Sequence, residues 1–157
     1  MRTDVLRDQL NDSLKDAMKS KDQRRVSTLR LVNAALKNAD IEARGQGKDA
    51  LGDDAMLTLL QKMIKQRQES AELYDKGGRP ELAQQEREEI DIISGFLPQQ
   101  MSDLEAGSVI QQIVHEINAQ GLKDMGRTMA ALKERFAGRM DFAKASAKVK
   151  ELLSSHK

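Results

Sequence analysis

The stretch Glu89–Glu105, EIDIISGFLPQQMSDLE, decides the organisation of this chain because one helical segment ends in it and another begins. Gly95 and Pro98 disfavour a helix that continues through this point. Proline lacks an amide donor and pushes the residue before it, Leu97, toward extended geometry. The sequence therefore predicts a break in the chain between two helical regions.

A new helix is predicted directly after this break. Ser102 followed three residues later by Glu105 is the pattern of a capping box, in which each residue satisfies a backbone amide of the other. We therefore expect two domains, residues 1–97 and residues 98–157, joined by a hinge at Phe96-Leu97-Pro98.

The composition predicts an all-α protein. Aromatic residues make up 3% of the 157 residues, and there is no Trp. Leu, Ala, Met, Gln, Lys, Arg and Glu dominate, and these side chains lose little freedom on entering a helix. Apolar periodicity and caps predict an N-terminal four-helix domain, with helices at 4–20 (capped by Thr3), 23–44 (capped by Asp22), 53–76 and 80–96, and a C-terminal three-helix mini-bundle, with helices at 102–118, 125–136 (capped by Asp124) and 142–153 (capped by Asp141). The periodicity places Leu31 in the apolar arc of the second helix and Leu104 in the apolar stripe of the helix at 102–118.

Several classes of protein are disfavoured by what the sequence lacks. No apolar run approaches the roughly 18 residues of a membrane span, and the first residues carry no signal-peptide hydrophobic segment. The absence of cysteine excludes disulfides, thiol catalysis and thiolate metal sites. We expect a cytoplasmic protein without a membrane partner, a cofactor or a metal ion.

Positive charge is concentrated near the C-terminus, although the net charge of the chain is only +1. Residues 127–150 hold seven Lys or Arg against two acidic residues, whereas residues 72–105 hold three against nine. A local basic surface favours a nucleic-acid partner through phosphate contacts. The candidate contacts are Arg127, Lys133, Arg135, Arg139, Lys144 and Lys148, together with the helix start at Met125 and Gly126.

The helix start at Met125-Gly126 has two interpretations. Free amides at a helix N-terminus bind anions, and a glycine lets a phosphate approach closely. Crowding between helices would explain Gly126 equally well.

A second candidate is a groove in the N-terminal domain, formed by Arg67, Tyr74, Arg30 and Lys37. Arg67 falls in the middle of an apolar arc, so we expect either an ion pair with Glu86 or Glu89 or an anion-binding role. Arg30 and Lys37, with Arg44, lie seven residues apart, and they form either a solvated face or a row of phosphate contacts.

The acidic cluster of the predicted helix at 80–96 is a further candidate site. Its members are Glu86, Glu88, Glu89 and Asp91. No histidine is near them, so a charged outer face is favoured over a divalent-ion site.

Taken together, these residues resemble the GatB/YqeY family over nearly the whole chain. The N-terminal matches include Thr28-Leu29-Arg30-Leu31, the run 62–67 (KMIKQR) with Tyr74, and Gly78-Arg79. The C-terminal matches include Leu97-Pro98, Asp124-Met125-Gly126 and Gly138-Arg139 with Asp141. Two positions depart from the pattern: Arg127 stands where Lys is expected, and Phe142 where a small residue is expected, which puts the geometry of the last turn in question.

The resemblance implies a stand-alone protein similar to the helical and tail domains of the B subunit of tRNA-dependent amidotransferases, whose tail helps to hold tRNA. A non-catalytic tRNA-binding module, accessory to tRNA-dependent amidation or tRNA metabolism, is therefore the leading hypothesis. The alternative is an adaptor that docks on an aminoacyl-tRNA synthetase or amidotransferase. Carbon–nitrogen ligase activity with glutamine as amide donor ranks last, because no nucleophile with an activating base is apparent.

Overall fold

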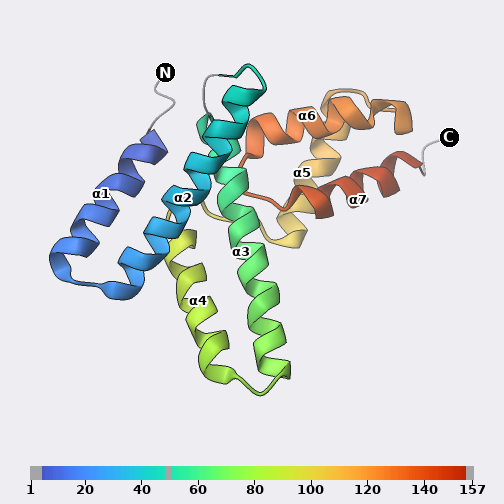
Figure 1. The fold of residues 1–157 in the computed structure, drawn as a ribbon. Coiled ribbons are helices and arrows are strands. Elements are labelled where there is room, and N and C mark those ends of the chain that lie inside the picture. Colours follow the sequence, from blue (N-terminus) through green and yellow to red (C-terminus); the bar gives the residue numbers. More distant parts are fainter. Residues whose placement is uncertain (1–4, 49–50, 155–157) are drawn as a thin grey trace. The chain divides into compact units, whose positions relative to one another are not determined.

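The structure is a computed structural model that describes residues 5–48 and 51–154 (Figure 1). Within those ranges the chain forms seven α-helices, one 3₁₀ helix and no strand, which confirms the all-α prediction. The predicted cap at Thr3 lies outside the described residues. The helices are α1 (Val5–Ser20), α2 (Gln23–Gly45), α3 (Asp53–Lys76), α4 (Pro80–Ser94), α5 (Asp103–Glu116), η1 (Leu122–Asp124), α6 (Met125–Phe136) and α7 (Phe142–Ser154).

The chain divides into two compact units, Met1–Leu97 and Pro98–Lys157. Helices α1 to α4 belong to the first unit and α5 to α7 to the second. That each unit folds as an independent domain, and that the segment between them acts as a hinge, stays a prediction.

Several helix ends show the capping interactions that the sequence predicts. The Asp22 carboxylate accepts a hydrogen bond from the Arg25 amide at the start of α2. Ser102 and Glu105 form the predicted capping box at the start of α5, in which the Glu105 amide donates to Ser102 Oγ over 3.1 Å and the Ser102 amide donates to Glu105 Oε1 over 3.3 Å. Pro80 occupies the first turn of α4, where its missing amide donor has no consequence.

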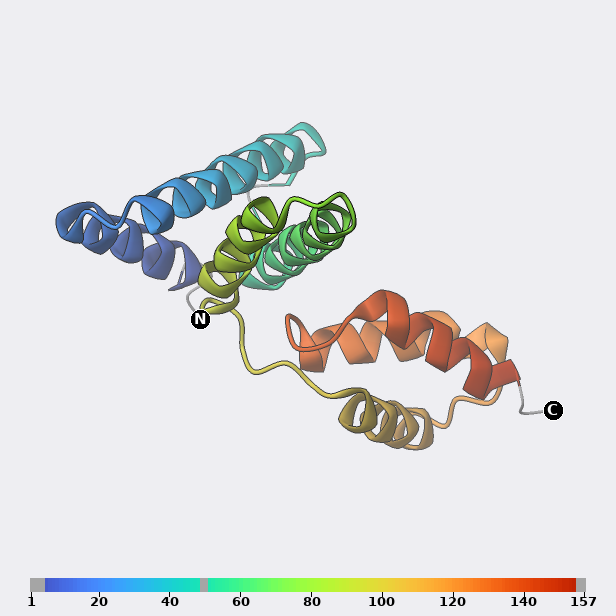
Figure 2. The same ribbon diagram turned by 90° about the horizontal axis from the view of Figure 1, so that it is seen from below.

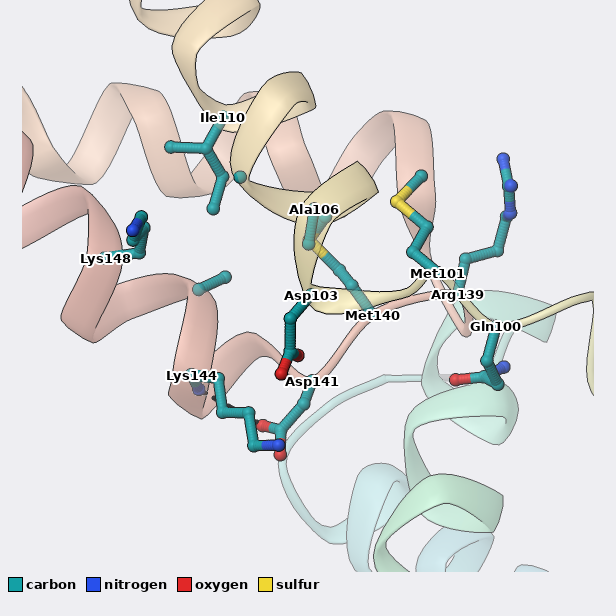
Figure 3. A pocket seen from close by; sticks show the side chains of 12 residues that line it. Gln100, Met101, Asp103, Ala106, Ile110, Arg139, Met140, Asp141, Lys144 and Lys148 are labelled. Carbon is teal, nitrogen blue, oxygen red and sulfur yellow. Dashed lines mark hydrogen bonds between the residues drawn. The ribbon is translucent and has the colours of Figure 1, made fainter.

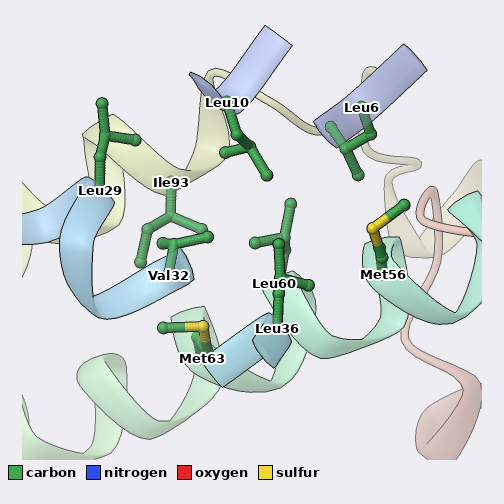
Figure 4. Close-up of a cluster of buried hydrophobic side chains, with 9 residues drawn as sticks. All are labelled: Leu6, Leu10, Leu29, Val32, Leu36, Met56, Leu60, Met63 and Ile93. Atoms are coloured by element: carbon green, nitrogen blue, oxygen red, sulfur yellow. The ribbon is translucent and has the colours of Figure 1, made fainter. Parts of the chain in front are cut away.

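The core of the first unit is an apolar cluster between α1, α2, α3 and the end of α4 (Figure 4). Leu29, Val32 and Leu36 are the members from α2. Leu31, which the periodicity placed in the same apolar arc, is instead 49% exposed, because it lies on the opposite side of the helix.

The second unit is built from three helices, with α6 and α7 side by side and α5 packed against both (Figure 2). Ile110, Ile113, Leu132 and Val149 are among its fully buried side chains, and Phe136 and Phe142 pack against them as half-buried rings. Leu104, predicted to join the apolar stripe of α5, is 86% exposed and is not part of this core. No described helix is both long and apolar enough to span a membrane.

Candidate nucleic-acid interface

A pocket of about 420 Å³ lies in the second unit between α5, α7 and the segment before each of them (Figure 3). Its apolar lining comes from Met101, Ala106, Ile110, Met140 and Ala145. Side chains of Arg139, Lys144 and Lys148 supply cations, and Asp103 and Asp141 supply carboxylates. The structure thus brings three of the six predicted cationic contacts to one place.

Small residues leave the space that becomes this pocket. Gly107 stands inside α5, where glycine destabilises a helix by roughly 1 kcal/mol relative to alanine. A Cβ built on Gly107 would meet only Lys148 Cε, at 4.0 Å, which is ordinary van der Waals contact. Packing within this chain therefore does not require a glycine at this position.

Lys144 and Lys148 are the cations best placed to meet an external anion. They lie one helical turn apart on α7, and both are exposed. Neither ammonium group forms a hydrogen bond or an ion pair with any other part of the chain that the structure describes. A phosphate group binding here would not have to displace an existing partner.

The two acidic groups of the pocket stand at helix N-termini. The Asp141 carboxylate accepts hydrogen bonds from the amides of Ala143 at 2.9 Å and Lys144 at 3.3 Å, which confirms it as the cap of α7. Asp103 is the first residue of α5. Carboxylates are stabilised at such positions by the helix dipole, so their presence has a structural reason.

Arg139 has a structural task in addition to its charge. Its Nε donates to the Gln99 carbonyl over 3.1 Å, and its guanidinium lies 6.0 Å from the centre of the Phe136 ring. Its own carbonyl accepts the Met101 amide at 2.8 Å. Arg139 therefore fastens residues 99–101 to the turn between α6 and α7.

Arg127 and Arg135 are exposed and pair with carboxylates of their own unit. Arg127 lies 3.1 Å from Asp124 and also donates to the Ile117 carbonyl, and Arg135 lies 2.7 Å from Glu116. The hydrogen bond from Arg135 is the main cause that lowers the pKa of Glu116.

The Asp124 carboxylate binds other groups than the amides of α6, which the sequence predicted it to cap. The carboxylate does not cap α6. It accepts the Gln120 amide at 2.8 Å and pairs with Arg127, and these two contacts, in that order, lower its pKa.

At the predicted phosphate site Met125-Gly126, one of the expected free amides is occupied. The Met125 amide donates to the Leu122 carbonyl, because η1 runs directly into α6, so this amide is not free. The Met125 side chain packs against the core, and the Asp124 carboxylate beside this helix end disfavours an anion. A Cβ on Gly126 would meet nothing within 4 Å, so helix crowding does not explain the glycine either.

Lys133, the remaining predicted contact, is exposed on α6. It does not line the pocket and has no side-chain partner among the described residues.

The four residues of the groove predicted in the first unit have different surroundings in the structure. Arg67 makes an ion pair with Glu89 on α4, with Arg67 Nε 3.8 Å from Glu89 Oε1, and donates to the Met63 carbonyl. This confirms the predicted ion pair with Glu89. Tyr74 is half-buried and Arg30 is exposed. Lys37 lines a separate pocket of about 340 Å³ with Arg7, Asn11, Asn33, Leu36 and Asp40.

The acidic cluster of α4 is only partly an outer face. Glu89 is 8% exposed because it faces Arg67, which corrects the expectation for this residue. Glu86 is half-buried, and burial followed by repulsion from Glu89 raises its pKa. Within 5–48 and 51–154, no three His, Asp or Glu residues are placed to hold a metal ion together.

The sequence did not predict that Asp103, Met140 and the small residues would form a pocket. The available signal was Gly107, a glycine inside a strongly predicted helix with a flanking Ala106. The pocket itself depends on how α5 and α7 meet, and no local pattern gives that.

Comparison with known proteins places the whole structure in a known group. A family model described as YqeY-like protein matches residues 7–153, from α1 to α7. Curated proteins called "Altered inheritance of mitochondria protein 41, mitochondrial" from several organisms are similar to this chain. The protein from Lachancea thermotolerans is 41% identical over 90 residues, which cover 57% of this chain and 46% of the relative.

Two other relatives differ in how much of each chain is matched. The protein from Pyrenophora tritici-repentis is 25% identical over 154 residues, which cover 96% of this chain and 82% of the relative. The protein from Eremothecium gossypii is 34% identical over 88 residues, which cover 56% and 46%. This chain therefore spans less than half the length of two of these three relatives. Their names describe them as mitochondrial, and a cytoplasmic location for this chain stays a prediction.

Proposed function

Because this chain belongs to the YqeY-like family, we propose that its C-terminal unit binds the sugar–phosphate backbone of tRNA and acts as a binding module rather than as an enzyme. The proposal rests on the resemblance of this unit to the tail domain of the amidotransferase B subunit, together with the arrangement of its cations. An accessory role in tRNA-dependent amidation or in tRNA metabolism follows from the same resemblance.

The observation that carries the proposal is the pair Lys144 and Lys148. Two exposed ammonium groups stand one turn apart on α7 without partners in the described chain, and Arg139 lines the same pocket with its guanidinium directed away from the two lysines (Figure 3). Such groups neutralise phosphates and release condensed counterions, which makes binding favourable and sensitive to salt. Backbone contacts of this kind position a nucleic acid without reading its sequence.

We also assign Arg127 and Arg135 to the proposed phosphate contacts. Each is about half exposed in its ion pair, at 56% and 49%. Exposed ion pairs contribute only about 0–1 kcal/mol, so a phosphate can replace the carboxylate as the partner of the guanidinium. Arginine also suits phosphate because its planar fork binds two oxygens at once.

Base stacking on Phe, Tyr or Trp has no evident platform among the described residues of this unit. Phe136 and Phe142 are half-buried against the core, and they are the aromatic residues of the described part of the unit. Sequence-specific recognition of single-stranded RNA normally uses exposed aromatic rings. Recognition by charge and shape follows from this composition.

The test is the salt dependence of tRNA binding by the full chain. Fluorescence anisotropy of labelled tRNA over a series of KCl concentrations gives the slope of log affinity against log salt. Replacing both lysines, Lys144→Ala with Lys148→Ala, removes two phosphate contacts and reduces the size of that slope by about 1.4–1.8.

A matched control uses Lys15→Ala with Lys19→Ala. These lysines have the same spacing and are also exposed, but they lie on α1 of the first unit. We expect their slope to equal that of the unchanged protein. Equal slopes for all three proteins, or no tRNA binding at low salt, would overturn the proposal.

A further inference from the structure

Helix α2 carries a second apolar stripe that its own unit does not use. Leu31, Ala34, Asn38 and Ile41 are all exposed, with Leu31 at 49% and Ile41 at 56%. We call these four residues the outer face of α2. They are spaced by three, four and three residues, which is the a–d–a–d pattern of helices that pack along one another.

The fold does not require this apolar character. The same helix already buries Leu29, Val32 and Leu36 in the core of the first unit (Figure 4). Those residues fix α2 in place, so polar residues at positions 31 and 41 would fold equally well. Two large aliphatic groups exposed on one helix face instead indicate a surface for a partner.

A row of cations runs along one side of the outer face. Arg30, Lys37 and Arg44 recur every seven residues and are all exposed. In the heptad set by Leu31 they occupy the three successive g positions, where charges select the partner of a helix pair and its direction. The opposite flank carries half-buried Ala35 and exposed Glu42, so the row of cations is not matched by an equal row of acids on this helix.

We propose that the outer face of α2 docks an amphipathic helix of a partner protein, whose own apolar stripe is flanked by acidic residues. The apolar contacts supply the buried surface, and the cations select a carboxylate-rich partner. Asn38 lies between Leu31 and Ile41, and a single polar residue at such a position fixes the register of the pair. This proposal is independent of tRNA binding by the second unit.

Charge complementarity favours such a partner over a second copy of this chain. Two antiparallel copies of α2 would place their cation rows against each other. Two parallel copies would bring Lys37 near Glu42 of the other copy but leave Arg30 opposite Ala35. RNA would meet the cations, but it would gain nothing specific from Leu31 and Ile41.

The experiment measures binding of two synthetic helices to the full chain by fluorescence anisotropy. Both probes are about three heptads long with Leu at positions a and d. One carries Glu at every e and g position, and its twin carries Lys there. We expect the acidic probe to bind and the basic twin not to bind.

Two variants test the two parts of the surface. Leu31→Ser with Ile41→Ser removes the exposed apolar groups, and Arg30→Glu with Lys37→Glu reverses two of the cations. Each double variant is expected to lower the affinity for the acidic probe about tenfold, and the charge reversal is expected to make the basic twin bind. Leu73→Ser is the matched control, because Leu73 is 69% exposed on α3 and lies outside the outer face.

Several results would overturn the proposal. Equal binding of the two probes is one such result, and unchanged binding of the acidic probe after Leu31→Ser with Ile41→Ser is another. A tenfold loss of tRNA affinity in that variant would assign the surface to RNA. A dimer in sedimentation velocity that this variant converts to monomer would assign the surface to a second copy. Thermal melting of each variant, expected to match the unchanged protein, shows that folding is kept.

Discussion

Arg7 on α1 and Asp40 on α2 form a two-armed ion pair across 33 residues of sequence, with nitrogen–oxygen distances of 2.8 and 2.6 Å. The Asp40 carboxylate also accepts the Leu51 amide at 3.1 Å, and Arg7 donates to the Leu51 carbonyl at 3.3 Å. The pair therefore fastens α1, α2 and the segment that leads into α3 at one point.

Replacing Asp40 by Asn should destabilise the protein by about 2 kcal/mol at neutral pH, because it removes the carboxylate that pairs with the partly buried Arg7. The hydrogen bonds from Arg7 are the main cause that lowers the pKa of Asp40. The unfolded chain thus takes up this proton at a higher pH than the folded chain. The stabilisation is complete above about pH 4 and is lost as the pH falls from there through the pKa of folded Asp40. Urea unfolding of both proteins across this range should show their difference shrinking in acid.

The control for this prediction is Asp75→Asn. Asp75 pairs with Arg87 between α3 and α4, but both side chains are exposed, at 44% and 46%. We expect a loss below about 1 kcal/mol. An equally large loss in Asp75→Asn would show that general charge, rather than the partly buried geometry at Asp40, controls stability.

The pair between Arg7 and Asp40 shows what the sequence could and could not supply. A carboxylate at position 40 lies on the same side of α2 as Leu29 and Leu36, so the need for a partner was visible. The choice of Arg7 was not visible, because it depends on how α1 crosses α2. Local rules act within a few residues, and they correctly predicted the capping box at Ser102 and the start of α6.

Arg67 and Glu89 form a second largely buried pair, with side chains 14% and 10% exposed. The Nε atom of Arg67 is buried without a hydrogen bond. Glu89→Leu alone should cost about 3 kcal/mol, because it leaves a buried charge unpaired. The double change Arg67→Met with Glu89→Leu should restore stability to within about 1 kcal/mol of the unchanged protein. A double variant as unstable as the sum of the single variants in urea unfolding would contradict this.

This pair was predictable because Arg67 interrupts an apolar arc, and a charge at such a position needs a counter-charge close by in the next helix. Periodicity failed where a helix has more than one apolar side. It counted Leu31 and Leu104 with the core, although the structure exposes both. A helix that is amphipathic in two directions does not reveal from its sequence which stripe its own domain covers. The candidate pocket also depends on tertiary placement, since Asp103 and Lys148 are far apart in sequence.

Gly107→Ala should raise the free energy of unfolding by about 1 kcal/mol, because alanine is the better helix former and its methyl group meets only ordinary contact at Lys148. Gly126→Ala should stabilise by about 0.5 kcal/mol for the same reason, since nothing lies within 4 Å of the added carbon. The measurement is urea unfolding of each variant.

Gly78→Ala is the control with the opposite expected sign. Gly78 has φ of +73° after α3, a conformation that L-residues rarely adopt, so alanine should destabilise there by about 1 kcal/mol.

Gly126→Ala should also leave tRNA affinity within about twofold, because the Met125 amide already has a partner and Asp124 repels anions at this helix end. A large loss of affinity would return the helix start to the list of phosphate contacts.

Arg135→Ala and Arg139→Ala should separate charge from structure at the proposed interface. Arg135 loses only an exposed ion pair with Glu116, so stability should stay within about 1 kcal/mol while the salt slope of tRNA binding falls by about 0.7–0.9. Arg139→Ala should lower stability as well, because the hydrogen bond to the Gln99 carbonyl and the contact with Phe136 are lost. The two changes together should lower affinity and flatten the salt dependence further. An unchanged slope of affinity against salt in Arg135→Ala would show that Arg135 of the unchanged protein stays paired with Glu116 when RNA binds. The phosphate contacts would then be assigned to the lysines of α7.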